Sequence, residues 1–185
     1  MLGTGDVTSP ATVELTQGGD EVEGRVTLDG CGYDFTSEGS RVARRQVSVR
    51  GSGSMTAGYS NEVVAYRDAA AAALALEQFS RSVTECPPRE LRESSVRGTP
   101  PTRQRLLTHR VDPAAAPVSP ATFTVEHVTS ESGQGYFASL VFQVRGDVLD
   151  GHYLITRRAP TKAQTAELWR QVSITGSRLL ALPAR

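Results

Sequence analysis

Short stretches in which apolar and polar residues alternate recur along most of the chain, and they constrain its fold more than any other feature. Val13 and Leu15 alternate with polar residues over 11–16, and the same period of two returns over 24–28 and 46–49. A strand-like run fills 62–67, and four further strands are indicated over 104–111, 122–128, 135–144 and 148–157. Such alternation suits strands with one buried face, which favours antiparallel pairing.

Two segments have the period of a helix instead. The first spans about 68–86, with Asp68 as its N-cap and an apolar stripe formed by Ala72, Leu76, Phe79, Val83 and Cys86. The second spans about 160–182, with Pro160 in its first turn and a stripe formed by Ala166, Trp169, Val172 and Leu179 or Leu180. We therefore predict an α+β domain: an antiparallel, meander-rich sheet of about 6–8 strands packed by two main helices. Trp169 is expected in the core, and a binding cleft is the alternative.

The length of 185 residues fits one domain. Residues 1–10 are polar and Gly-rich, which indicates a flexible remnant of a linker, and 11–185 are expected to form the domain. Seven of the ten prolines lie within 87–120. That segment is therefore expected to be an irregular excursion around one strand.

With a formal net charge of zero, the chain has no overall electrostatic attraction to polyanions. Twenty basic residues match twenty acidic ones, so a nucleic-acid partner is not expected. No run of about 18 apolar residues exists, and Met1–Pro10 lacks the regions of a signal peptide. An attachment to a membrane would then need an N-terminal anchor that this chain lacks.

Two cysteines, Cys31 and Cys86, stand 55 positions apart. This spacing matches no zinc pattern, which leaves a disulfide or two inert buried thiols. A disulfide is favoured because the chain has no other cysteine and each of these flanks a regular element. It would indicate an oxidising compartment outside the cytoplasm.

No residue pattern predicts catalysis. His109, His127 and His152 fall on expected strands without the neighbours of a metal site, so they are expected to be half-exposed spectators. The run Gly51-Ser52-Gly53-Ser54 has neither the spacing of a nucleophile elbow nor that of a phosphate loop, and it indicates a hairpin turn. We predict no catalytic residues, no metal and no cofactor.

The charged clusters are expected to be solvated. Acidic pairs lie beside a turn and at a strand start; they are Asp147 with Asp150 and Glu21 with Glu23. Arginines gather at 41–45 and 157–158, where Arg41, Arg44, Arg45, Arg157 and Arg158 could also grip a phosphate or an acidic head group.

The stretch from Cys31-Gly-Tyr-Asp-Phe through Arg41-Val-Ala-Arg-Arg and Ser60-Asn-Glu-Val-Val to Cys86-Pro87 resembles actinobacterial envelope proteins and lipoproteins related to the PknH-like extracellular sensor domain. That resemblance implies an antiparallel sheet packed by helices, a disulfide between Cys31 and Cys86, and a cleft for an unknown ligand. It implies no catalytic residues. The chain departs from the kinase sensor pattern in having two cysteines instead of four.

Together these features lead us to expect a non-enzymatic, extracytoplasmic domain, secreted or anchored at the cell surface, that binds an unknown small ligand or an envelope protein. One alternative is a protein–protein interaction module of the envelope. The other is a hydrolase whose histidine and hydroxyl come from distant strands.

Overall fold

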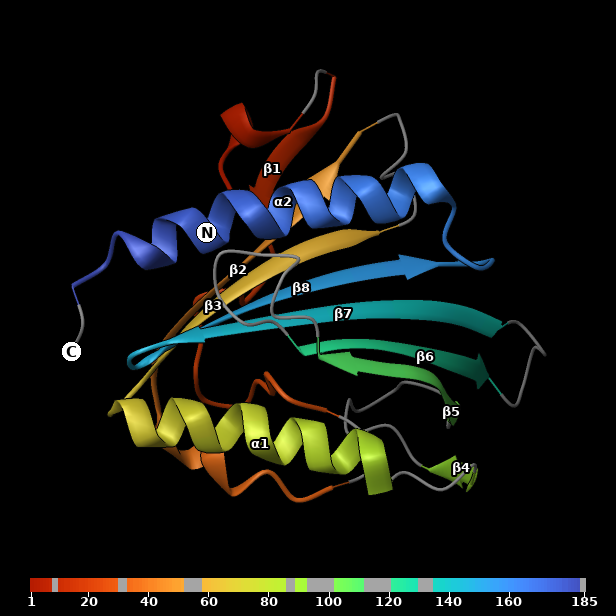
Figure 1. The fold of residues 1–185 in the computed structure, drawn as a ribbon, viewed down its shortest axis with the longest axis horizontal. Coiled ribbons are helices and arrows are strands. Elements are labelled where there is room, and N and C mark those ends of the chain that lie inside the picture. Colours follow the sequence, from red (N-terminus) through yellow and green to blue (C-terminus); the bar gives the residue numbers. More distant parts are fainter. Residues whose placement is uncertain are drawn as a thin grey trace.

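A computed structural model describes residues 1–7, 10–29, 33–51, 58–85, 89–92, 102–111, 121–129 and 135–183 of the chain (Figure 1). Eight antiparallel strands form one sheet, and one helix lies on each of its faces. The strands are β1 (Thr12–Leu15), β2 (Arg41–Arg50), β3 (Tyr59–Tyr66), β4 (Arg89–Arg92), β5 (Thr102–Val111), β6 (Ala121–Thr129), β7 (Gly135–Arg145) and β8 (Val148–Thr156). The predicted α+β class is confirmed.

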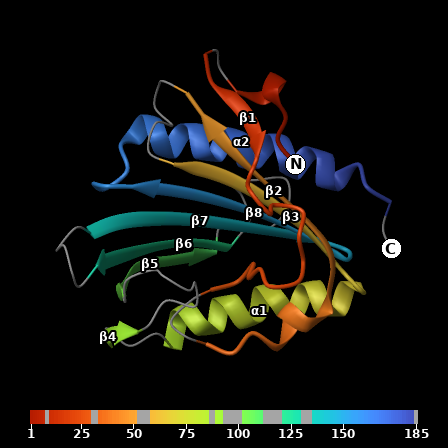
Figure 2. The same cartoon turned by 180° about the vertical axis from the view of Figure 1, so that it is seen from behind.

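Two meanders make up the sheet. The strand order is β1-β2-β3-β8-β7-β6-β5-β4, so β1 to β3 form one meander and β4 to β8 the other. They join where β3 pairs with β8, which brings Asn61 opposite His152 although 91 positions separate them. Figure 2 shows the same sheet from behind, with α1 crossing its lower part.

The helix α1 (Ala69–Glu85) follows β3 directly. Asp68 is its N-cap as predicted, because the Asp68 carboxylate accepts a hydrogen bond of 2.8 Å from the backbone N–H of Ala71. The helix α2 (Lys162–Leu180) begins after a capping box formed by Thr161 and Gln164, two residues later than predicted. Neither described helix is long and apolar enough to cross a membrane.

Each helix encloses its own apolar core. On the α1 side of the sheet, Phe79 and alanines from the first two turns of the helix pack against alternate residues of β3, β7 and β8. The α2 side packs Leu168 and Val172 against the other alternate residues of the same strands and of β2. The central strands are thus buried on both faces. Alternate residues along each strand enter different apolar cores, so the period of two does not mark one buried and one solvent-exposed face.

Three segments differ from the sequence predictions. Residues 24–28 form no strand but cover β2, held by the guanidinium of Arg41, which donates to the carbonyl of Arg25 at 2.6 Å. The proline-rich excursion contains a short edge strand, β4, that lacks an alternating pattern. The stripe of α2 is rotated, since Ala166 is exposed and Trp169 is half-buried beside the core.

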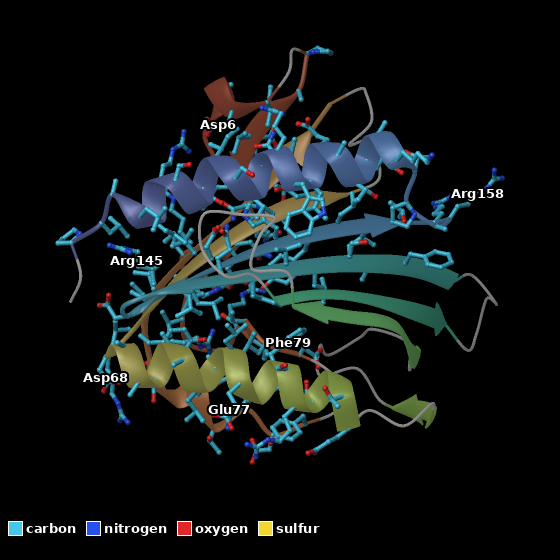
Figure 3. The ribbon with its side chains drawn as sticks, viewed as in Figure 1. Asp6, Asp68, Glu77, Phe79, Arg145 and Arg158 are labelled. Carbon is cyan, nitrogen blue, oxygen red and sulfur yellow. The ribbon has the colours of Figure 1, made fainter. Side chains whose placement is uncertain are left out.

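The chain start is also more ordered than predicted. Residues 1–10 are predicted to be a flexible linker remnant, yet Leu2 is 2% exposed and its N–H donates to the side chain of Asn61 at 2.9 Å. Asp6 forms two hydrogen bonds of 2.7 Å with the guanidinium of Arg178 on α2. Figure 3 labels Asp6 beside that helix. The first residues therefore belong to the folded domain.

Candidate functional site

A cluster of polar side chains lies between the sheet and α2. It combines residues from two central strands, one flanking strand and the helix, each at most 2% exposed: Tyr59, Asn61, Gln143, Asp150, His152 and Thr175. Buried polar groups are costly unless they bind one another, so a cluster of this size is either a structural network or a functional site.

The strand register brings these groups together. Asn61 on β3 is opposite His152 on β8, and Gln143 on β7 is opposite Asp150. Residues two apart on a strand point to the same face, which places Asp150 and His152 side by side under α2. The helix adds Thr175 from its buried stripe.

Asp150 is the centre of the cluster. Its carboxylate accepts hydrogen bonds from Asn61 at 2.6 Å, from Thr175 at 2.6 Å and from Gln143 at 3.1 Å. Burial would raise the pKa of Asp150, but the charge and hydrogen bond of His152 and the two shorter bonds outweigh burial and lower the pKa to about 2. Asp150 is therefore an ionised acceptor at neutral pH.

His152 is engaged at both ring nitrogens. Nε2 lies 2.9 Å from Asp150 Oδ2 and 2.8 Å from Thr175 Oγ1, and Nδ1 lies 2.5 Å from the hydroxyl of Tyr59. An ionised carboxylate only accepts hydrogen bonds, so Nε2 carries a proton, and Nδ1 shares the other hydrogen bond with the Tyr59 hydroxyl. Burial raises the pKa of Tyr59 well above its usual value, which keeps the Tyr59 hydroxyl protonated.

These contacts are not those of a hydrolytic triad. In a triad the nucleophile and the carboxylate bind opposite nitrogens of the histidine, so that the carboxylate orients a base that is free to take a proton. Here Thr175 and Asp150 share Nε2, and Tyr59 occupies Nδ1. The Asp150 and His152 side chains are also 0% exposed, which leaves no room for a substrate.

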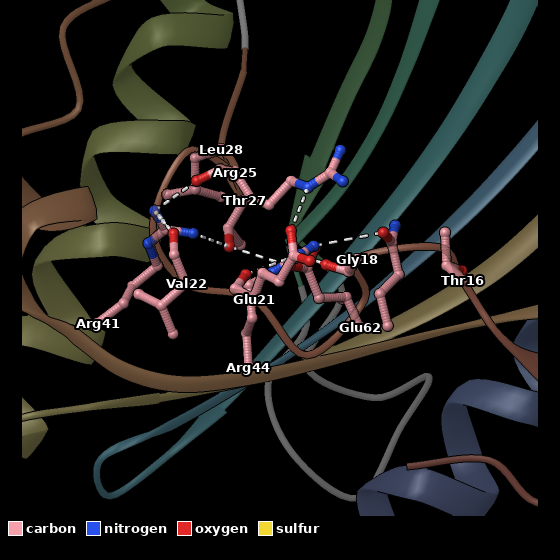
Figure 4. A network of polar contacts seen from close by, with 12 residues as sticks. Thr16, Gly18, Glu21, Val22, Arg25, Thr27, Leu28, Arg41, Arg44 and Glu62 are labelled. Carbon is pink, nitrogen blue, oxygen red and sulfur yellow. Dashed lines mark hydrogen bonds and ion pairs between the residues drawn. The ribbon is translucent and has the colours of Figure 1, made fainter.

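A second polar network lies on the opposite face of the sheet, under residues 16–28 (Figure 4). Arg44 and Glu62 form an ion pair of 2.7 Å whose side chains are 3% and 2% exposed. Glu62 also accepts from Thr27 and from the hydroxyl of Tyr153, both at 3.0 Å. The same Arg44 guanidinium donates to the carbonyls of Gly18 and Glu21, so this network fastens the covering segment to the sheet.

The residues that the sequence analysis singled out differ in how deeply they are buried. His152 and Asp150, expected to be partly exposed or solvated, are fully buried, and so is Arg44. Arg45, Arg157 and Arg158 are exposed, as expected for solvated arginines. Glu21 and Glu23 are exposed, as expected for solvated carboxylates, and Glu21 pairs with Arg25 at 3.2 Å.

Other predictions lie outside the described part of the chain. They concern Cys31 and Cys86, the residues 52–57 of the expected hairpin turn, and the side chains of His109 and His127. The described side chains contain no group of three or more His, Cys, Asp or Glu that could hold a metal ion.

Sequence reasoning missed Asn61, Gln143 and Thr175. One signal was present, because Asp150 and His152 share a face of a strand whose other face carries Tyr153 and Ile155. Polar residues on the second face of a central strand indicate either that this face is exposed to solvent or that it carries a buried polar network. Only the position of α2 distinguishes these two possibilities.

The fold of this chain is similar to that of a solved extracellular domain. No protein-family model matches the sequence, and no curated protein matches it significantly. The crystal structure of the extracellular domain of PknH from Mycobacterium tuberculosis superposes with a TM-score of 0.53 over 95% of this chain and 80% of that one, at 13% sequence identity. The likeness therefore lies in the fold, at a distance where the sequence establishes no shared family.

Proposed function

We propose that this chain is a non-enzymatic, extracytoplasmic domain that binds a ligand in the manner of a sensor domain. The observation that carries the proposal is the fold likeness to the extracellular domain of PknH, which extends over 95% of the chain. The two cysteines support the same location, because a disulfide between them would need an oxidising compartment.

The chemistry of the buried cluster supports a binding role over an enzymatic one. Its carboxylate, imidazole and hydroxyl groups bind one another, and both ring nitrogens of His152 are occupied. A general base needs a free lone pair within reach of substrate. The cluster instead holds α2 and the chain start against the sheet, as a binding scaffold requires.

The test is a ligand screen on the purified, oxidised chain. Thermal unfolding is followed against a panel of lipids, sugars and peptides, and hits are repeated by native mass spectrometry. A bound ligand raises the unfolding temperature in proportion to the logarithm of its concentration. If no compound shifts the midpoint while the chain hydrolyses an ester or peptide substrate, the proposal is wrong.

A further inference from the structure

Two arginines on the α2 side of the sheet have no ionic partner among the described residues. Eight other arginines form ion pairs: Arg25, Arg41, Arg44, Arg50, Arg67, Arg81, Arg170 and Arg178. Arg45 on β2 and Arg145 on β7 form none. Arg157 and Arg158 also form none within the described part of the chain, but both are exposed beyond the end of β8, whereas Arg45 and Arg145 lie on the sheet.

Arg145 is the more unusual of the two. Its Nε is buried from solvent and has no hydrogen-bond partner among the residues that the structure describes. A buried donor on a charged group that binds nothing is costly, and native proteins rarely keep one without a water, an ion or a ligand to accept from it. Figure 3 shows Arg145 at the end of β7, beside the turn to β8.

Small apolar residues lie between the two arginines. The register aligns Arg145 with Val148 on β8, Val148 with Ala65 on β3, and Ala65 with Ala43 on β2. Arg45 is opposite Val63 in the next row. Alternation along each strand puts all six side chains on the face that carries the buried cluster.

This face remains partly open at that end of the sheet. Ala43 is exposed, and Val63, Ala65 and Val148 are half-buried. We call the six residues the arginine-flanked strip: Ala43, Arg45, Val63, Ala65, Arg145 and Val148. The strip combines an apolar floor with two guanidinium groups that lack a counter-charge.

From this arrangement we infer that the arginine-flanked strip binds an amphiphilic anion, with its acidic head at Arg145 and its acyl chain along the apolar residues toward Arg45. Guanidinium groups suit carboxylate and phosphate geometry, and the head would accept from the buried Nε. Alanine side chains let a thin alkyl chain lie close to the sheet. This inference names a ligand class for the proposed function and rests on it.

The first test is an NMR titration of the whole chain with decanoate, below its micelle concentration. A ligand of this size should bind with a dissociation constant on the order of a millimolar or below. We expect saturable shifts of the backbone amides of residues 43–45, 63–65 and 145–148. Decyl maltoside supplies the chain without a charge, and inorganic phosphate supplies the charge without a chain, so both should bind at least about tenfold more weakly.

Two variants and one control separate recognition from folding. Arg145→Gln should weaken decanoate binding about tenfold, because it removes the cation that meets the head. It should not lower the unfolding temperature, since the buried Nε has no partner to lose. Arg67→Gln removes the same charge from an exposed pair with Asp68 and should leave binding unchanged. Ala43→Asp, at an exposed position, should abolish binding by placing a charge against the acyl chain.

Three results would overturn the inference: no saturable shifts, equal binding of decyl maltoside, or equal loss of affinity in Arg145→Gln and Arg67→Gln. Phosphate binding as tight as that of decanoate would also overturn it, because it would show an anion site to which the acyl chain adds nothing. The proposed function fails separately. If decanoate does not bind but another compound raises the unfolding temperature, ligand binding stands and only the arginine-flanked strip is wrong.

Discussion

The carboxylate of Asp150 accepts hydrogen bonds from three strands and a helix, so its replacement should be among the most destabilising single changes in the chain. In Asp150→Asn, an NH2 group replaces one of the two carboxylate oxygens and would face either Asn61, which donates to Oδ1, or Gln143, which donates to Oδ2, so at least one donor would lose its partner. We expect a loss of about 3 kcal/mol in the free energy of unfolding, measured by urea denaturation. Asp20→Asn, at an exposed position, is the control. Equal midpoints for the two variants would contradict the central role of Asp150.

The same carboxylate predicts how stability depends on pH. The pKa of Asp150 is about 2 in the folded chain, against an ordinary value of 3.8, so the folded state binds fewer protons between these values. Its contribution, roughly 2 kcal/mol, is therefore complete above about pH 4 and is lost as the pH falls toward 2. Urea midpoints of the wild type should drop over that window. Those of Asp150→Asn should drop less, and parallel curves would refute the assignment.

Gly151 lies between Asp150 and His152 on β8 but faces the apolar core on the α1 side of the sheet. A Cβ there would lie 2.9 Å from Cε1 of Phe142 and 3.0 Å from the hydroxyl of Tyr153. Phe142 in turn packs against Phe79 of α1, with ring centroids 4.6 Å apart. Gly151→Ala should therefore cost about 1–3 kcal/mol by forcing the aromatic layer under α1 apart.

The matched control for Gly151→Ala is Gly39→Ala. A Cβ at Gly39 meets nothing within 4 Å, so the stability of that variant should stay within about 0.5 kcal/mol of the wild type. Thermal unfolding of both variants distinguishes the two environments. A neutral Gly151→Ala would mean that Phe142 can move at little cost.

Of the two arginines that hold the segment over β2, Arg41 and Arg44, Arg44 is the more deeply buried. Arg44→Leu would leave Glu62 buried without its counter-charge and would release the carbonyls of Gly18 and Glu21. We expect a loss of about 3–5 kcal/mol and faster hydrogen exchange at residues 17–28. Arg50→Leu breaks an exposed pair with Glu14 and should change little. Exchange that is unchanged in Arg44→Leu would show that other contacts hold the segment.

At the scale of the molecule, the expected disulfide would tie the segment before β2 to the end of α1. Cys31 and Cys86 enclose a loop of 55 positions, and closing it should stabilise the fold by about 4 kcal/mol in the chain-entropy view. Mass spectrometry without reductant should show a chain two hydrogens lighter that resists alkylation, and reductant should lower its unfolding temperature. Two alkylated thiols in the native chain would rule out the bond and weaken the extracytoplasmic proposal.

The local elements could be predicted because each depends on its own residues. Alternation marked the strands β7 and β8, and Asp68 followed by alanines marked the start of α1. Residues 24–28 also alternate but form no strand. The side chains of Arg41 and Arg44 donate hydrogen bonds to backbone carbonyls of the covering segment, which would otherwise be free to pair with a neighbouring strand. The edge strand β4 pairs through its backbone, which leaves no periodic signal.

Hydrophobic period and capping residues act over a few positions, so the α+β class, the two helices and most of the strands follow from the amino-acid sequence alone. The pairing of β3 with β8 and the position of α2 over the second face of both depend on contacts between distant segments. Those long-range contacts place Asn61, Asp150 and Thr175 within hydrogen-bond distance and bury them, and they leave the Nε of Arg145 without a hydrogen-bond partner among the described residues. A polar residue looks the same in sequence whether it meets water or another chain segment, so burial and partnership were properties of the assembled fold.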